Sequence, residues 1–256
     1  MPKYPGNFHG HPPITDEIFA ILHAQGIAKG QVDPSLPLLS GLPGCPKYFR
    51  SGKNFINFDR GYFHHFLQDG SGESTHWRIV YNYMWHDHLG DFPDDRMKES
   101  KVPILDWQSG DKIAICAPDP YHCEIFGLNA NRWIEKTSAE IRKYSDRPIV
   151  LNHRKVNPVR EIYKDLHCVV TFHSNCWLHA LMIGVPVITT CKHRKIGSID
   201  QIENPPRDRS FIQNMFYKQW TMAQFESGQA WEEFCQLSKN SPANLIEDRC
   251  EYVYHE

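Results

Sequence analysis

Between Lys112 and Thr190, short apolar runs alternate with amphipathic segments, and this alternation limits the possible folds more than any other feature. The apolar runs are KIAICAPD, RPIVLNHRK, CVVTFHS and VPVITT, and the segments between them are NRWIEKTSAEIRKYS, VREIYKDL and NCWLHALMIG. Strands that alternate with helices form βαβ units and a parallel sheet. Runs such as CVVTF, apolar on both faces, are typical of strands covered by helices on both sides. The sequence therefore predicts an α/β fold.

The flanking sequence is less regular. A capping-type Thr-Asp-Glu start predicts a helix over residues 14–30, and two β-type runs predict strands at 55–58 and 77–81. Residues 210–237 have the pattern of two helices that break at Ser227-Gly228, with Phe216, Trp220 and Phe225 facing inward.

Composition excludes several classes of protein. The 256 residues are 41% hydrophobic and 23% charged, which fits globular domains with a core. The eight cysteines form no CxxC pair, which argues against a disulfide scaffold or zinc ribbon and indicates a reducing compartment. The N-terminus lacks the order of a signal peptide, and no apolar run reaches the roughly 18 residues of a membrane span. We therefore expect a cytoplasmic protein without a membrane span.

The formal net charge of −2 means that a polyanion would have to bind a local patch and not the whole surface. The segments KHRK at 192–195 and PPRDR at 205–209 form such a basic stretch. It could contact phosphate, although stretches of this kind are usually solvated surface.

Polar residues follow two of the predicted parallel strands. They are His153, Arg154 and Lys155 after one strand, and His173, Ser174 and Asn175 after the next. Ligands of such sheets lie beyond the carboxyl ends of the strands, where Arg and Lys can grip a diphosphate and a following helix favours an anion. The alternative is that Ser174 only caps the helix and that the basic residues form a solvated turn. The segment CAPD at 116–119 ends a third strand at the same edge.

The segment WHDH, which contains His86 and Asp87, raises the question of a metal site, because imidazole and carboxylate are common ligands. No third and fourth ligands follow at a recognisable spacing, so we predict no metal. His86 and Asp87 could instead support substrate binding, or Asp87 could act as a base, while solvated surface residues are the simpler interpretation.

The order strand, HSN, helix WLHAL and then GVPV resembles the donor-binding half of GT-B glycosyltransferases, mainly over residues 111–190. The resemblance implies that this segment holds a nucleotide-diphosphate sugar as donor substrate. The sequence departs from the retaining type of that family, because His179 stands where many members have a Glu.

A wider resemblance includes FINFDRGYF, THWRIVYN, SDRPIVLNHRK and KQWTMAQFESGQAW. Together these segments resemble a group of bacteriophage-encoded glycosyltransferases, some of which modify DNA bases. The resemblance implies a hydroxymethylated pyrimidine in double-stranded DNA as the first acceptor and the host cytoplasm as the location. A glycan or a lipid-linked saccharide is the alternative acceptor.

The GT-B resemblance implies two Rossmann-like halves with parallel sheets, a reduced N-terminal half and C-terminal helices that cross back. We expect an N-terminal acceptor-side domain at 1–105, a donor domain at 106–209 and a helical segment at 210–256 that packs across both.

Transfer to a hydroxyl needs a base or hydrogen-bond acceptor near that hydroxyl and charge stabilisation for the departing diphosphate. Asp59, at the end of the strand FINFD, is the candidate for the first role, with Arg60 and Arg78 as supporting residues. The alternative role of Asp59 is structural, in an ion pair with Arg60 or Arg78 that holds a loop in place. Arg154, Lys155 and the amides at Ser174 would supply the second role without a metal. Two other classes of function remain. One is a nucleotide-sugar-binding or epimerase-like protein without transfer, and the other is a metal-dependent hydrolase.

Overall fold

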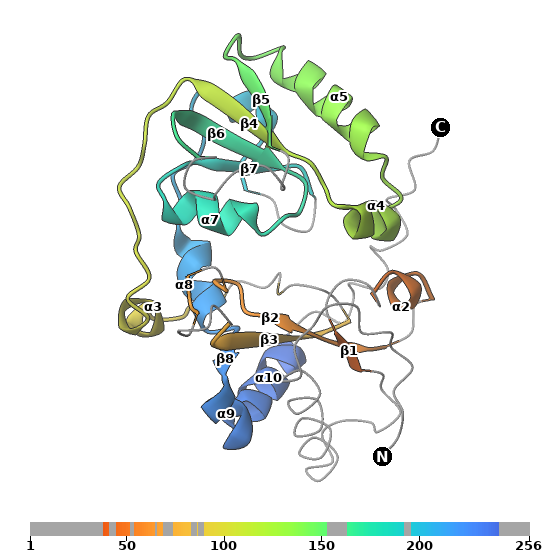
Figure 1. Ribbon diagram of the computed structural model, residues 1–256, viewed down its shortest axis with the longest axis vertical. Coiled ribbons are helices and arrows are strands. Elements are labelled where there is room, and N and C mark those ends of the chain that lie inside the picture. The colour runs from red at the N-terminus through yellow and green to blue at the C-terminus, as the bar shows by residue number, and fades with distance from the viewer. Residues whose placement is uncertain are drawn as a thin grey trace. The chain divides into compact units, whose positions relative to one another are not determined.

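The computed structural model describes residues 38–40, 45–51, 54–64, 66–68, 74–82, 86, 90–152, 163–191 and 196–240 (Figure 1). The chain divides into two compact units, of which unit 1 comprises Met1–His88 and Met215–Glu256, and unit 2 comprises Leu89–Asn214. This division differs from the three predicted segments. The C-terminal segment belongs with the N-terminal one, because the two share a sheet and a hydrophobic core.

Unit 2 contains a four-stranded parallel sheet. Its strands are β4 (Lys112–Cys116), β5 (Ile149–Asn152), β6 (Leu166–Thr171) and β7 (Val187–Thr189), in the order β5-β4-β6-β7. All four were predicted from their apolar runs, and the α/β class with a parallel sheet is confirmed. From β4 the chain continues to β5 at one edge of the sheet, and from β6 it continues to β7 at the opposite edge. Because crossovers are right-handed, the intervening helices lie on opposite faces.

The helices of unit 2 follow local sequence signals. They are α3 (Asp95–Glu99), α4 (Pro120–Phe126), α5 (Ala130–Ile141), α7 (Cys176–Met182) and the 3-10 helix η1 (Ile199–Gln201), followed by α8 (Ser210–Phe216) at the boundary between the units. The sequence analysis missed α4, although Asp119 caps it, Pro120 opens it and Gly127 ends it in the left-handed conformation. Half of the helix predicted at 159–166 lies outside the described residues. In the other half the prediction is wrong, because residues 163–165 form a turn and Leu166 begins β6.

The return from α7 into β7 is the tight turn that the sequence indicates. Gly184 has a φ of 85°, its amide donates to the carbonyl of Leu181 over 3.2 Å, and the amide of Val185 donates to the carbonyl of Ala180 over 2.8 Å. These two bonds form a Schellman motif, which satisfies the last carbonyls of a helix. A Cβ at Gly184 would collide with the backbone carbonyl of Asp106.

Unit 1 contains a mixed sheet, contrary to the prediction of parallel sheets in both halves. Its strands are β1 (Leu38–Ser40), β2 (Ile56–Arg60), β3 (His76–Tyr81) and β8 (Trp220–Thr221), in the order β1-β2-β3-β8. Only β1 and β2 are parallel, and the other neighbours are antiparallel. The polar sequence QDGSGEST between β2 and β3 has no amphipathic helix pattern that could carry a parallel crossover.

One face of this sheet packs on the C-terminal helices α9 (Met222–Glu226) and α10 (Gln229–Asn240). The core residues of this layer are Ile56, Phe58, Trp77, Ile79, Trp220, Phe225, Ala230, Trp231 and Phe234. The predicted break at Ser227-Gly228 and the burial of Phe216, Trp220 and Phe225 are confirmed. The prediction of a single helix before that break is wrong, because α8 and α9 are separate helices with the short strand β8 between them.

A further helix of unit 1 is α2 (Cys45–Ser51), and the helix predicted at 14–30 lies outside the described residues. Across the described ranges, no helix combines the length and apolar character needed to cross a membrane.

Candidate functional site

The strand order of unit 2 creates one position that favours ligand binding. The direction of the chain reverses between β4 and β6, which are neighbours in the sheet. In open α/β sheets, ligands bind beyond the carboxyl ends of the two strands at such a switch point. The residues that follow β4 and β6 are therefore the candidate site.

After β4, Asp119 and His122 form a tight pair. One carboxylate oxygen of Asp119 accepts the amide of His122 over 3.0 Å, and the other lies 2.5 Å from Nδ1 of the same residue. The His122 side chain is only 1% exposed. A carboxylate at Nδ1 fixes the ring orientation of an imidazole. Burial and then the Asp119 charge raise the pKa of the neighbouring Cys123 thiol, which disfavours the thiolate form.

After β6, His173 packs against this pair. Its ring centroid lies 6.1 Å from that of His122 and 6.1 Å from that of Phe126, and both neighbours are stacked on it. The structure thus places His122, which is paired with Asp119, against His173 at two neighbouring strand ends. The sequence analysis did not identify His122 as a site residue. The pair of Asp119 and His122 could have been identified from its Asp-x-x-His spacing, because Pro120 begins a helix between the two residues.

Ser174 and Asn175 lie at the start of α7, and Asn175 is the N-cap residue of that helix. The hydroxyl of Ser174 accepts the amide of Cys176 over 3.4 Å, and its carbonyl accepts the amide of Trp177 over 3.3 Å. The carbonyl of Asn175 accepts the amide of Leu178 over 3.1 Å. Since these first amides already have partners within the chain, an anion at this place would be bound mainly by side chains.

The remaining donor-side residues, His153, Arg154 and Lys155, lie outside the described residues, as does Asp87. The described part of β5 ends at Asn152, directly before His153.

In unit 1, Asp59 forms the ion pair that the sequence analysis gave as its alternative role. Asp59 Oδ2 lies 2.6 Å from Arg78 Nη2, and Asp59 Oδ1 accepts the amide of Arg60 over 2.8 Å. The two charged residues face each other across β2 and β3. The side chains are 18% exposed for Asp59 and 3% for Arg78, whose guanidinium lies 4.8 Å from the centre of the Tyr62 ring.

His86 also packs inside unit 1. Its Nδ1 lies 2.9 Å from the Tyr62 hydroxyl, its amide donates to that hydroxyl over 2.8 Å, and its ring lies 6.4 Å from Trp220. Among the residues that the structure describes, no group of three His, Cys, Asp or Glu side chains could hold a metal ion.

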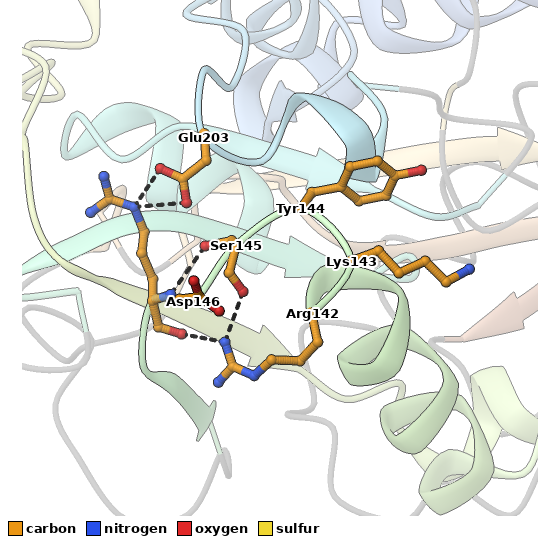
Figure 2. Close-up of a pocket in the computed structure, with 7 residues that line it drawn as sticks. Arg142, Lys143, Tyr144, Ser145, Asp146 and Glu203 are labelled. Atoms are coloured by element: carbon orange, nitrogen blue, oxygen red, sulfur yellow. Dashed lines mark hydrogen bonds and ion pairs between the residues drawn. The ribbon is translucent and has the colours of Figure 1, made fainter.

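A cavity of about 640 Å³ lies at the opposite, amino edge of the unit 2 sheet (Figure 2). It is lined by residues 142–147 and Glu203, and its cations already have partners. Lys143 pairs with Glu140 over 2.5 Å, and Arg147 donates to both Glu203 oxygens over 3.2 and 2.9 Å. Arg142 donates to two backbone carbonyls.

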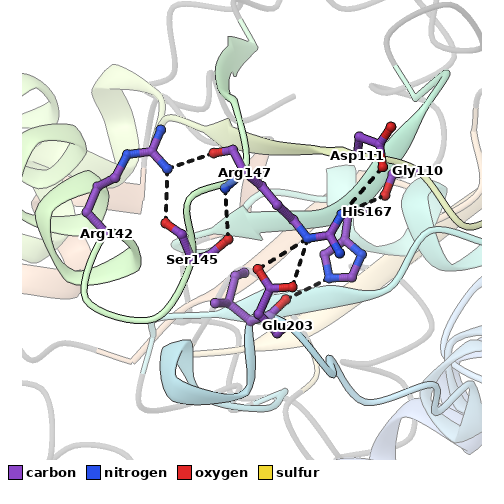
Figure 3. A network of polar contacts seen from close by, with 8 residues as sticks. Gly110, Asp111, Arg142, Ser145, Arg147, His167 and Glu203 are labelled. Atoms are coloured by element: carbon purple, nitrogen blue, oxygen red, sulfur yellow. Dashed lines mark hydrogen bonds and ion pairs between the residues drawn. The ribbon is translucent and has the colours of Figure 1, made fainter.

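Figure 3 shows Arg142, Ser145, Arg147 and Glu203 as part of a network that joins the starts of β4, β5 and β6. Arg147 also donates to the carbonyl of Gly110 over 3.2 Å, and the His167 ring lies 2.8 Å from the carbonyl of Ile202. The hydrogen bond from Ser145 and then the charge of Arg147 lower the pKa of Glu203. The network ties segments of the fold together, so we do not assign a ligand to this cavity.

Comparisons of the chain with protein-family models, curated proteins and solved structures found no significant match.

Proposed function

We propose that the protein is a glycosyltransferase that takes its sugar from a nucleotide-diphosphate donor bound at the carboxyl edge of the β5-β4-β6-β7 sheet. The observation that carries the proposal is the switch point between β4 and β6, where His122, which is paired with Asp119, stacks on His173. In the proposed GT-B-like arrangement, unit 2 is the donor half and unit 1 is a reduced acceptor half. The resemblance of HSN, WLHAL and GVPV to GT-B enzymes supports transfer as the activity.

On the donor side, Arg154 and Lys155 are the proposed diphosphate ligands, with His153, His173, Ser174 and Asn175 beside them. Because the first amides of α7 are already bonded, the cationic side chains would supply most of the charge stabilisation. Such cations can stabilise a departing diphosphate in the same way as a metal, so the proposal requires none.

On the acceptor side, Asp59 is the proposed hydrogen-bond acceptor for the reacting hydroxyl. A carboxylate offers about four lone-pair positions, and the described contacts of Asp59 use two of them. The exposed 18% of the side chain leaves room for a further partner. The first proposed acceptor is a hydroxymethylated pyrimidine in DNA, which would leave the base stack to react. The second is a glycan or lipid-linked saccharide.

The first test is a thermal-shift panel of UDP, GDP, ADP, CDP and their sugars. A ligand that binds only the folded state raises the melting temperature by mass action. We expect one nucleotide to stand out in the wild type and to lose its effect in the double variant Arg154→Ala, Lys155→Ala. The matched control is Lys112→Ala with Lys143→Ala, which removes two exposed cations at the opposite edge of the sheet.

Retained binding in the control and lost binding in the double variant would support the donor site. A wild type that responds to no nucleotide would refute it. A nucleotide that binds without transfer to hydroxymethylated DNA or to any glycan would point to a binding protein or an epimerase-like enzyme.

A further inference from the structure

The parallel sheet of unit 2 has two edge strands of different character. At one edge β7 is covered, since Val187 and Ile188 are fully buried. At the other edge β5 pairs only with β4 among the strands that the structure describes (Figure 1). Val150 and Leu151 of β5 are 37% and 47% exposed. Because successive side chains of a strand point to opposite faces, this edge exposes an apolar side chain on each face of the sheet.

The outer edge of β5 also carries backbone groups that can form further hydrogen bonds. The amide of Ile113 donates to the carbonyl of Pro148 over 2.9 Å, and Ile113 lies opposite Ile149 in the parallel register. Alternate residues of a parallel strand bond to its neighbour, so Val150 directs its backbone groups to β4, while Ile149 and Leu151 direct theirs outward. Within the described part of the chain, these outward amides and carbonyls form no hydrogen bond.

None of the usual devices that prevent edge pairing is present in the described residues of this edge. Such devices are charged side chains, bulges and prolines that remove an outward amide. Ile149, Val150 and Leu151 are uncharged, and their pairing with β4 is regular. Pro148 stands before the strand, but it occupies a position that faces β4, so it removes no outward amide. The edge of β5 is therefore able to pair with another strand.

The pattern of β5 is complementary to itself. In two copies related by a twofold axis, the strands run antiparallel and each Val150 can lie opposite the same residue of the other copy. Ile149 of each copy then lies opposite Leu151 of the other, and the two residues exchange both of their hydrogen bonds. This register uses every outward amide and carbonyl of the two strands. It also places Ile149 and Leu151 side by side on one face, where such cross-strand pairs stabilise a sheet.

The charges around the start of β5 do not oppose contact between two copies. Three of the charged residues are basic and three are acidic, namely Arg142, Lys143, Arg147, Glu140, Asp146 and Glu203. A balanced set of this kind does not favour a highly charged partner, and it does not repel a second copy as a set of one sign would. Twofold contacts between identical surfaces are also the commonest arrangement in soluble oligomers.

We propose that the protein forms a twofold dimer in which the β5 strands of two copies pair antiparallel and join the two parallel sheets into one continuous sheet. Because β5 has only four residues, the strand contact is small and the dimer should dissociate on dilution. This association is independent of the proposed donor site, since no nucleotide takes part in it.

The test measures the mass of the full chain by sedimentation equilibrium between about 5 and 500 μM, a range in which weak dimers form and dissociate. We expect the wild type to approach twice the mass of the monomer at the upper end. Val150→Lys and Val150→Glu each place like charges opposite each other at the twofold axis, where paired Cβ atoms lie about 5 Å apart. Each variant alone should therefore remain monomeric. An equimolar mixture of the two should dimerise again, because opposite charges then face each other.

Leu105→Lys is the matched control. It introduces the same charge at an apolar residue that is 50% exposed, and the amide of Leu105 is bonded to Met182 at the end of α7 and not to β5. This variant should dimerise like the wild type. The melting temperature of each variant at low concentration shows whether it is folded.

The proposal is overturned if the wild type stays monomeric over the whole range, or if folded Val150→Lys dimerises as strongly as the wild type. It is also overturned if the mixture associates no more than the two variants alone, since the strands would then not meet at Val150. The nucleotide panel decides the donor site separately, because a melting-temperature shift by nucleotide can be measured in monomer and dimer alike.

Discussion

The ion pair between Asp59 and Arg78 makes a quantitative prediction, because its two members differ in burial. Asp59→Asn leaves a guanidinium charge whose side chain is 3% exposed, and removing one partner of a buried pair costs about 3–5 kcal/mol. Arg78→Met leaves a carboxylate that is 18% exposed and partly solvated. We expect the free energy of unfolding to fall by about 3 kcal/mol in Asp59→Asn and by about 2 kcal/mol in Arg78→Met.

The double variant, Asp59→Asn with Arg78→Met, removes both charges and keeps most of the side-chain volume. Replacing a buried pair by uncharged groups is often close to neutral, so we expect a loss of only about 1–2 kcal/mol. The coupling free energy between the two sites would then be about 3–4 kcal/mol, somewhat above the usual 0.5–3 kcal/mol for residues in contact.

Urea unfolding followed by tryptophan fluorescence measures these free energies, since Trp77 and Trp220 lie in the core of the same sheet. The reasoning is refuted if Asp59→Asn costs less than about 0.5 kcal/mol, the range of ordinary surface substitutions. It is also refuted if the loss in the double variant equals the sum of the two single losses.

The double variant also separates structure from catalysis at Asp59. If it folds, binds nucleotide and lacks transfer activity, Asp59 has a role in the reaction. If it transfers sugar at the wild-type rate, Asp59 serves only the ion pair.

Two further predictions concern backbone sterics and pH. Gly184→Ala should lower the free energy of unfolding by more than about 3 kcal/mol or prevent folding, because the φ of Gly184 is 85° and the new Cβ would meet the backbone of Asp106. In Gly127→Ala, where φ is 62° and nothing lies within 4 Å of the new Cβ, the loss should be only about 1–2 kcal/mol. Thermal unfolding measures both losses. Burial lowers the pKa of His76 from 6.5 to about 4, so the unfolded state takes up the proton first as pH falls. The contribution of His76 to stability is therefore fully present above pH 6.5, and the free energy of unfolding falls by up to about 3 kcal/mol towards pH 4. His76→Gln should make the free energy of unfolding depend less on pH, as measured by urea titrations at several pH values.

Local patterns determined much of unit 2. The strands β4, β6 and β7 are continuous apolar runs, α5 and α7 have amphipathic or apolar helical patterns, and Gly184 stands where a helix must return into the sheet. Such features depend on neighbouring residues, since side-chain periodicity and glycine conformation act within a few positions of the chain. The α/β class and the positions of its strands could therefore be predicted from the sequence.

Only the tertiary structure decided which residues meet. Asp59 faces Arg78 because β2 and β3 are antiparallel in one particular register, and His122 stacks on His173 because β4 and β6 are neighbours in the sheet. The side chain of Asn57 is likewise buried in the sheet, with no hydrogen-bond partner within the part of the chain that the structure describes. Alternation of side chains determines the face on which a residue lies, but the partner across the strand follows from packing the whole chain, in which many pairings satisfy the same local pattern.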